Sequence, residues 1–136
     1  MKPTTRLWTA QAVLAALFLF AGISKLIMPT DLLATQSHMN GEFIKFIGIC
    51  ETLGALGLIL PGVTKIHTEL TPLAAAGLVI IMIGAVVTSI IHGAGVGSAF
   101  PGFVGLVAFY VARGRWTSVT RPVPAALTPT VLRRAA

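Results

Sequence analysis

The sequence predicts an all-α integral membrane protein, a bundle of four membrane-spanning helices. Two observations lead to this prediction. The chain of 136 residues is 55% hydrophobic and only 10% charged, whereas an ordinary soluble domain carries about 25% charged residues. It also contains four long windows that are almost free of charge, and a spanning helix needs about 20 apolar residues. So small a domain could not hide this many apolar side chains from water, so we expect lipid to surround it.

The first two helices are expected at about 7–27 and 43–61. No charge interrupts the sequence between Arg6 and Lys25, and the deepest charge of the second window is Glu51. The first window has the basic start of a signal peptide, but no A-x-A-like cleavage site follows it. We therefore interpret it as a spanning helix.

The third and fourth helices are expected at about 71–91 and 98–113. The third window is uncharged throughout. The fourth is shorter, because Gly93, Gly95 and Gly97 favour a loop before it.

Two segments lie outside this pattern. In the connection 28–42, Thr30 or Asp31 could cap a short helix at the outer interface. We expect residues 1–115 to form one membrane domain. Residues 116–136 are rich in Thr, Pro and Arg, and are expected to form a disordered basic cytoplasmic tail.

The distribution of basic residues predicts the topology. With four helices, most of the ten Lys and Arg residues fall on one side, and only Lys25 and Lys45 fall on the other. The positive-inside rule then places both termini in the cytoplasm, with Trp8 and Trp116 as interfacial anchors. Because the basic residues gather at helix ends, the net charge of +6 does not indicate a nucleic-acid partner. The bilayer is the partner that composition predicts.

Glu51 is the residue least expected in such a helix. At about 1.5 Å per residue it lies roughly 12 Å below the outer end, near mid-membrane, where a charge costs about 2.5–3.5 kcal/mol. Its helical neighbours include Gly48, Gly54 and Ala55, and faces of small residues pack against other helices in membranes. Glu51 is therefore expected to point into the bundle, either as a functional acid or as a structural hydrogen-bonding group.

Lys25 is the charged neighbour that depth favours for Glu51, with an axial offset of about 8 Å. A pair would keep both groups charged, whereas an isolated Glu51 would take up a proton and stay neutral. Lys25 could instead extend to the outer headgroups. The sequence leaves these alternatives open.

The candidate site follows from these helix faces. Glu51 is the candidate acid or base, Lys25 its charge partner and His92 a third candidate. The three histidines lie in separate segments without metal-ligand spacing, so no metal site is expected. Six residues on the same inward faces are candidate ligand-binding residues: Phe18, Gly22, Gly48, Ala55, Gly84 and Thr88.

Four stretches carry a resemblance to a known family. They resemble the DoxX-like family of small bacterial four-helix membrane proteins, over about residues 10–115: LFLFAGISKL (17–26), GICETLGALGLILPG (48–62), LTPLAAAGLVIIMIGAVVTSI (70–90) and GLVAFYVARGR (105–115). The resemblance implies a location in the bacterial inner membrane. The family pattern often has a histidine where Ser89 stands here. The histidine of this chain, His92, follows three residues later, so the role of the family histidine does not carry over to His92 by position.

The resemblance also implies candidate functions. Members are similar to a subunit of an archaeal thiosulfate:quinone oxidoreductase, or are linked to oxidative-stress complexes or to amine dehydrogenase maturation. We therefore expect a pocket around Glu51 and Lys25 that binds a small apolar or quinone-like molecule in a redox-linked complex, with a membrane oxidoreductase or a second copy as partner. Quinone is the one candidate cofactor, since the chain has no redox centre of its own. The alternatives are an intramembrane isomerase or cyclase using Glu51 as acid or base, and a structural or assembly subunit.

Overall fold

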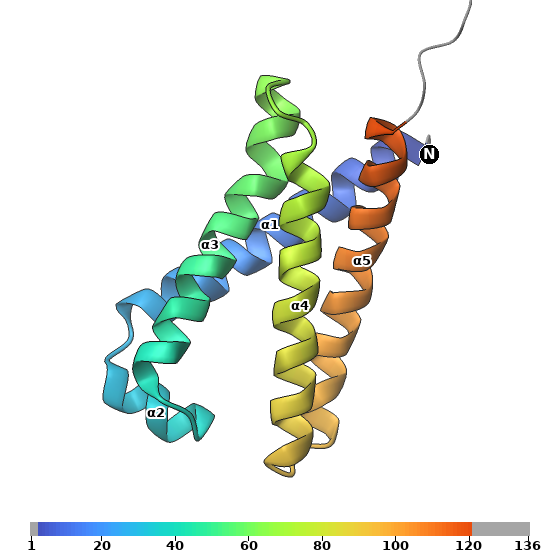
Figure 1. Cartoon of the computed structure of the whole chain (residues 1–136). Helices are drawn as coiled ribbons and strands as arrows, with labels where there is room; N and C mark the ends of the chain where they lie inside the picture. The colour runs from blue at the N-terminus through green and yellow to red at the C-terminus, as the bar shows by residue number, and fades with distance from the viewer. Residues whose placement is uncertain (1–2, 121–136) are drawn as a thin grey trace, which may run out of the picture.

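The computed structural model describes residues 3–120, which form five α-helices and one 3₁₀ turn (Figure 1). Four segments, containing α1, α3, α4 and α5, are long and apolar enough to cross a membrane. The expected all-α, multi-pass architecture is therefore confirmed. The elements are α1 (Pro3–Ile27), α2 (Thr30–Ser37), α3 (Gly41–Thr64), α4 (Leu70–Ile91), η1 (Val96–Ser98) and α5 (Ala99–Val119).

Three predicted helix ends were wrong. The first helix was expected to begin at residue 7, yet α1 begins at Pro3. The second helix was expected to stop at Pro61, yet α3 continues through this buried proline to Thr64. Proline is tolerated inside membrane helices because neighbouring groups can satisfy the carbonyl that it leaves free. The fourth helix continues through 116–119, which were assigned to a disordered tail. There the Ser118 hydroxyl donates to the Gly114 carbonyl at 2.9 Å. The rest of the predicted tail, 121–136, lies outside the described residues.

The connection between the first two spanning helices contains the expected short helix, α2. Its predicted cap was wrong, because Pro29 occupies the N-cap position and no side chain caps the helix. His38 then takes a left-handed conformation with φ of 54°, which turns the chain towards α3. Asn40 caps α3, since its Oδ1 accepts a hydrogen bond from the Glu42 backbone N–H at 2.8 Å.

The spanning helices differ in how they pack. α3 packs against both α1 and α4, and α4 packs against α5. Figure 1 shows α1 crossing obliquely behind α3 and α4, from the end of α5 towards α2. We call the end of the bundle where α1 begins and α5 ends the terminal end, and the opposite end the α2 end.

The interior is apolar and so is much of the outer surface. Phe18, Leu58 and Leu78 are buried in one core cluster that all four spanning helices share. On the outside, Phe20 is 77% exposed and Leu106 is 69% exposed. A surface of large apolar side chains suits a protein whose surroundings are lipid.

Two glycines let α1 and α3 approach closely. A Cβ atom built at Gly22 would lie 2.7 Å from the Gly48 carbonyl oxygen, and one at Gly48 would lie 3.0 Å from the Gly22 carbonyl oxygen. We call this contact the Gly22–Gly48 crossing. Gly77 of α4 differs, because a Cβ there would meet no atom within 4 Å. The first two glycines are therefore required by packing, and Gly77 is not required by any packing among the described residues.

We predict that Gly22→Ala lowers the free energy of unfolding by about 1–3 kcal/mol, because the added methyl group overpacks the crossing. The matched variant Gly77→Ala should leave stability unchanged or raise it by up to about 1 kcal/mol, because alanine is the better helix former. Unfolding in detergent followed by circular dichroism measures both. Equal stabilities for the two variants would contradict a close crossing.

Candidate functional site

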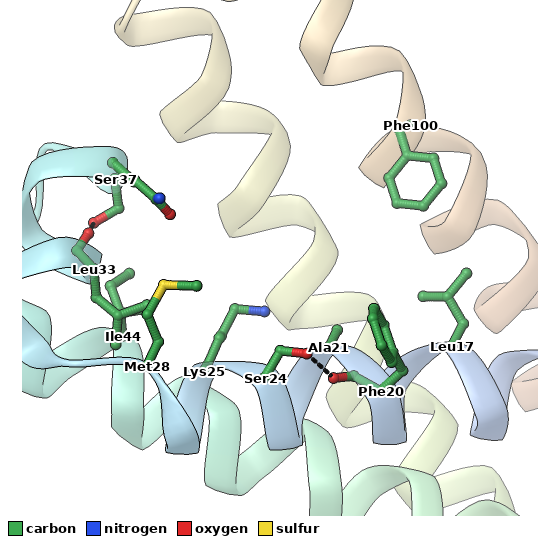
Figure 2. Close-up of a pocket in the computed structure, with 11 residues that line it drawn as sticks. Leu17, Phe20, Ala21, Ser24, Lys25, Met28, Leu33, Ser37, Ile44 and Phe100 are labelled. Carbon is green, nitrogen blue, oxygen red and sulfur yellow. Dashed lines mark hydrogen bonds between the residues drawn. The ribbon is translucent and has the colours of Figure 1, made fainter.

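A pocket of about 480 Å³ opens at the α2 end of the bundle (Figure 2). Its walls come from the second half of α1, from α2, and from Ile44 of α3 and Phe100 of α5. The walls are mostly apolar, and the volume lies within the range of about 300–1,000 Å³ that is usual for ligand pockets. The polar side chains in its lining are Ser24, Lys25, Gln36 and Ser37.

The pocket exists because α1 and α5 diverge. They are in contact at the terminal end, where Leu7 lies against Gly114, and they separate towards the α2 end (Figure 1). α2 fills the space only in part. Two of the lining residues, Phe20 and Phe100, are 77% and 64% exposed, so the pocket is open on a side that carries apolar side chains.

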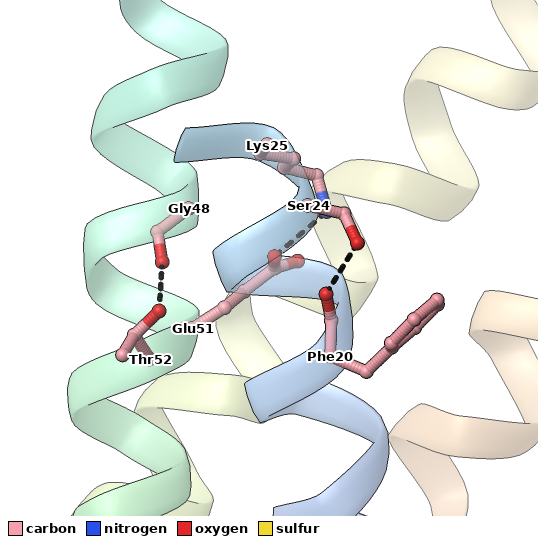
Figure 3. A network of polar contacts seen from close by, with 6 residues as sticks. All are labelled: Phe20, Ser24, Lys25, Gly48, Glu51 and Thr52. Carbon is pink, nitrogen blue, oxygen red and sulfur yellow. Dashed lines mark hydrogen bonds and ion pairs between the residues drawn. The ribbon is translucent and has the colours of Figure 1, made fainter. Parts of the chain in front are cut away.

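Lys25 is the charged group in the pocket wall, and it is paired. Its Nζ donates to Oε2 of Glu51 at 2.7 Å (Figure 3). The Glu51 side chain is 4% exposed and that of Lys25 is 29% exposed. The structure therefore brings the two predicted residues together, with Lys25 at the pocket and Glu51 buried behind it.

The Gly22–Gly48 crossing explains how the two charges meet. A Cβ at Gly48 would lie 3.0 Å from Cβ of Lys25, so the missing side chain leaves space for the lysine. Glu51 stands one helical turn after Gly48 on the same face. The lysine side chain can therefore run along α3 to the carboxylate. The Thr52 hydroxyl does not donate to this carboxylate, since it donates to the Gly48 carbonyl at 2.8 Å.

The pair satisfies the two charges in an environment that offers few other partners. Among residues 3–120 it is the only ion pair that joins a lysine or arginine to a carboxylate. Removing one member of a buried pair leaves the other charge uncompensated, which is costly. Ser24 cannot readily replace Lys25 as the donor to Glu51, because its hydroxyl already donates to the Phe20 carbonyl at 2.7 Å (Figure 3).

The six predicted ligand-binding residues do not line this pocket. Phe18 and Ala55 belong to the packed core, and Gly22 and Gly48 form the crossing. The other two lie on α4. A Cβ at Gly84 would meet no atom within 4 Å, and the Thr88 hydroxyl donates to the Gly84 carbonyl at 2.9 Å.

Part of the lining that sequence reasoning missed lies on a neighbouring face of α1. Phe20 and Ser24 of this helix line the pocket, as does Met28 just after it, whereas the predicted face ran through Phe18 and Gly22. Helical spacing identifies residues that share a face, but the tilt of α1 decides which face meets a neighbour and which meets the pocket. That tilt is a property of the crossing with α3.

His92, the third candidate, lies apart from the Lys25–Glu51 pair. It follows α4, its Nδ1 is 2.8 Å from the Thr88 carbonyl oxygen, and its ring stacks on His38 with 5.4 Å between centroids. Among the described residues no three potential metal ligands come together.

At the other end of the bundle, a backbone hydrogen bond and then His67 hold the pKa of Glu69 below its usual range.

A second polar cluster, at the terminal end, was missed by sequence reasoning. Gln11 is fully buried; its Nε2 donates to the Leu58 carbonyl and its Oε1 accepts from Arg115 Nε at 2.7 Å. The Arg115 guanidinium lies over the Trp8 ring, 4.9 Å from its centroid. Trp8 and Arg115 were interpreted only as an interfacial anchor and a topology signal. Gln11, a lone amide in an apolar helix, was the signal that could have revealed the cluster.

Comparison with known protein families gives a match over most of the chain. The sequence profile of the DoxX-like family matches residues 9–112. No curated protein and no solved structure matches the chain.

We predict that substituting the two members of the pair lowers the stability of the protein by unequal amounts. Lys25→Met leaves the deeply buried Glu51 without its hydrogen-bond partner and should lower the free energy of unfolding by about 1–3 kcal/mol. Glu51→Gln should cost less, because the partly exposed lysine can extend outward. The double variant should cost less than the sum of the two single variants. Unfolding in detergent measures all three, and strictly additive losses would contradict a direct pair.

Proposed function

This chain belongs to the DoxX-like family, and we propose that it is a membrane protein that binds a small lipid-soluble, quinone-like molecule beside Lys25, as part of a redox-linked complex of a bacterial inner membrane. The observation that carries this proposal is a paired ammonium group in the wall of a mostly apolar pocket. In this proposal the termini face the cytoplasm and the α2 end faces outward, as the positive-inside rule favours.

The chemistry of the pair supports a neutral ligand with a hydrogen-bond acceptor. A lysine ammonium has three N–H donors, and one of them is used by Glu51. The others can donate to a carbonyl oxygen in the pocket. Because Glu51 balances the lysine charge, the site as a whole is neutral and has no excess charge with which to attract an anion. A quinone carbonyl on an apolar ring fits these requirements.

In the proposed role the pair also handles a proton. Reduction of a quinone-like molecule requires protons at its oxygens, and Lys25 is the titratable group in the pocket lining. We assign the electrons to a partner oxidoreductase subunit, because the chain has no redox centre of its own and its single cysteine cannot form a dithiol pair. The chain then binds the ligand and supplies or accepts a proton.

Two alternatives use the same residues differently. If the protein is an isomerase or cyclase, Lys25 is the group that touches the substrate, because Glu51 is 3% exposed and does not line the pocket. Glu51 then tunes the lysine instead of acting as the acid or base itself. If the protein is a structural subunit, the pair only fastens α1 to α3. Ligand binding separates the structural alternative from the other two.

The test compares Lys25→Met with Lys45→Met, a half-buried lysine of α3 outside the pocket lining. Organic extracts of each purified protein are analysed for bound quinone by mass spectrometry, and a short-chain quinone is titrated by equilibrium dialysis. Hydrogen bonds to charged groups contribute about 1.5–3 kcal/mol, so Lys25→Met should weaken binding about 10-fold or more. Lys45→Met should bind like the wild type.

The result that would overturn the proposal is equal quinone binding by the two variants, or no quinone binding by the folded wild-type protein. The redox-linked complex has a separate test. Gentle solubilisation should keep the protein with a quinone-reducing activity through size-exclusion chromatography. Elution as an isolated protein without that activity would remove the complex from the proposal while leaving ligand binding to stand on its own measurement.

A further inference from the structure

The cluster of Trp8, Gln11 and Arg115 at the terminal end carries a positive charge that no carboxylate side chain of the chain balances. The whole sequence has four acidic side chains. Glu51 holds Lys25, and Glu69 contacts His67. Asp31 and Glu42 stand at the α2 end. An arginine guanidinium stays protonated in proteins, so the balancing anion must come from outside these side chains.

The guanidinium of Arg115 is held in a fixed orientation. Its Nε donates to Gln11, which is itself anchored to the Leu58 carbonyl of α3. One face of the guanidinium lies over Trp8. Nη2 is buried and has no hydrogen-bond partner among the described residues. A buried donor without a partner is unfavourable, and more so when it is charged. Nη2 is therefore a charged donor that still needs an acceptor, and the side chains that cover it must move before one can reach it.

The position of the cluster indicates which anion is at hand. Arg115 lies in the last two turns of α5, next to the exposed Trp116 and before the helix ends at Val119. Tryptophan and arginine at the end of a spanning helix lie at the level of the lipid headgroups. The anion present at this level in any phospholipid bilayer is the lipid phosphate.

We propose that Arg115 and Trp8 form a binding site for the phosphate group of an anionic phospholipid at the terminal end. The planar guanidinium matches two phosphate oxygens with parallel N–H donors along its edge. Trp8 supports one face of the guanidinium. Seating the phosphate requires the side chains that cover Nη2 to rotate. The site is independent of the pocket beside Lys25, because it is built from the opposite end of the bundle.

The experiment uses the full chain in nanodiscs of phosphatidylcholine, into which phosphatidylglycerol is titrated. Trp116→Phe leaves Trp8 as the only tryptophan. Quenching of Trp8 fluorescence by brominated phosphatidylglycerol then reports lipid bound next to Trp8 and Arg115. Native mass spectrometry counts retained lipids. Arg115→Gln should weaken phosphatidylglycerol binding about 10-fold or more, because the charged hydrogen bonds to the phosphate are lost. The matched variant Arg113→Gln, at an exposed arginine of the same helix end, should change it less than 2-fold, by about 0.4 kcal/mol.

Three results would overturn the proposal. Equal losses in Arg115→Gln and Arg113→Gln would indicate diffuse attraction by a basic surface. Recovery of Trp8 fluorescence when inorganic phosphate is added at the concentration of the brominated lipid would indicate a site for the free ion. Absence of selective quenching in the folded protein that keeps Arg115 would show that no lipid binds there, and this measurement holds even if Arg115→Gln does not fold.

Discussion

The pairing of Lys25 with Glu51 is the constraint on which the rest of the structure depends. A carboxylate buried in the middle of α3 needs a counter-charge, and α1 supplies it only if the two helices come close. Gly22 and Gly48 allow that approach because neither has a side chain at the contact. The resulting tilt of α1 carries its second half away from α5, so the same contact that pairs the charges also opens the pocket.

The two ends of the bundle handle buried polar groups in different ways. At the terminal end, Gln11 and Arg115 tie α1 to α3 and α5 and close the bundle. At the α2 end, the polar contact binds α1 to α3 alone, and α5 stands apart across the pocket. The open pocket with its apolar side therefore lies at the α2 end. The helices that form its walls are held together at the terminal end.

Much of the architecture could be predicted from sequence, because four windows almost free of charge and the bilayer thickness leave few alternatives. Helical periodicity and depth also placed Lys25 near Glu51. The pocket lining could not be predicted, since it depends on the angle at which α1 crosses α3. The bond from Arg115 to Gln11 joins residues 104 positions apart, and no local pattern predicts it. Continuation of α3 through Pro61 depends likewise on its surroundings in the bundle.

The most direct test of this account is the distance between Lys25 Nζ and the Glu51 carboxyl carbon in a lipid bilayer, measured by solid-state nuclear magnetic resonance with ¹⁵N-lysine and ¹³C-glutamate. The 2.7 Å contact predicts strong mutual dephasing that disappears in Lys25→Met and persists in Lys45→Met. No dephasing in the wild-type protein would show that Lys25 extends to the headgroups, and that neither the Gly22–Gly48 crossing nor the pocket is built around a Lys25–Glu51 pair.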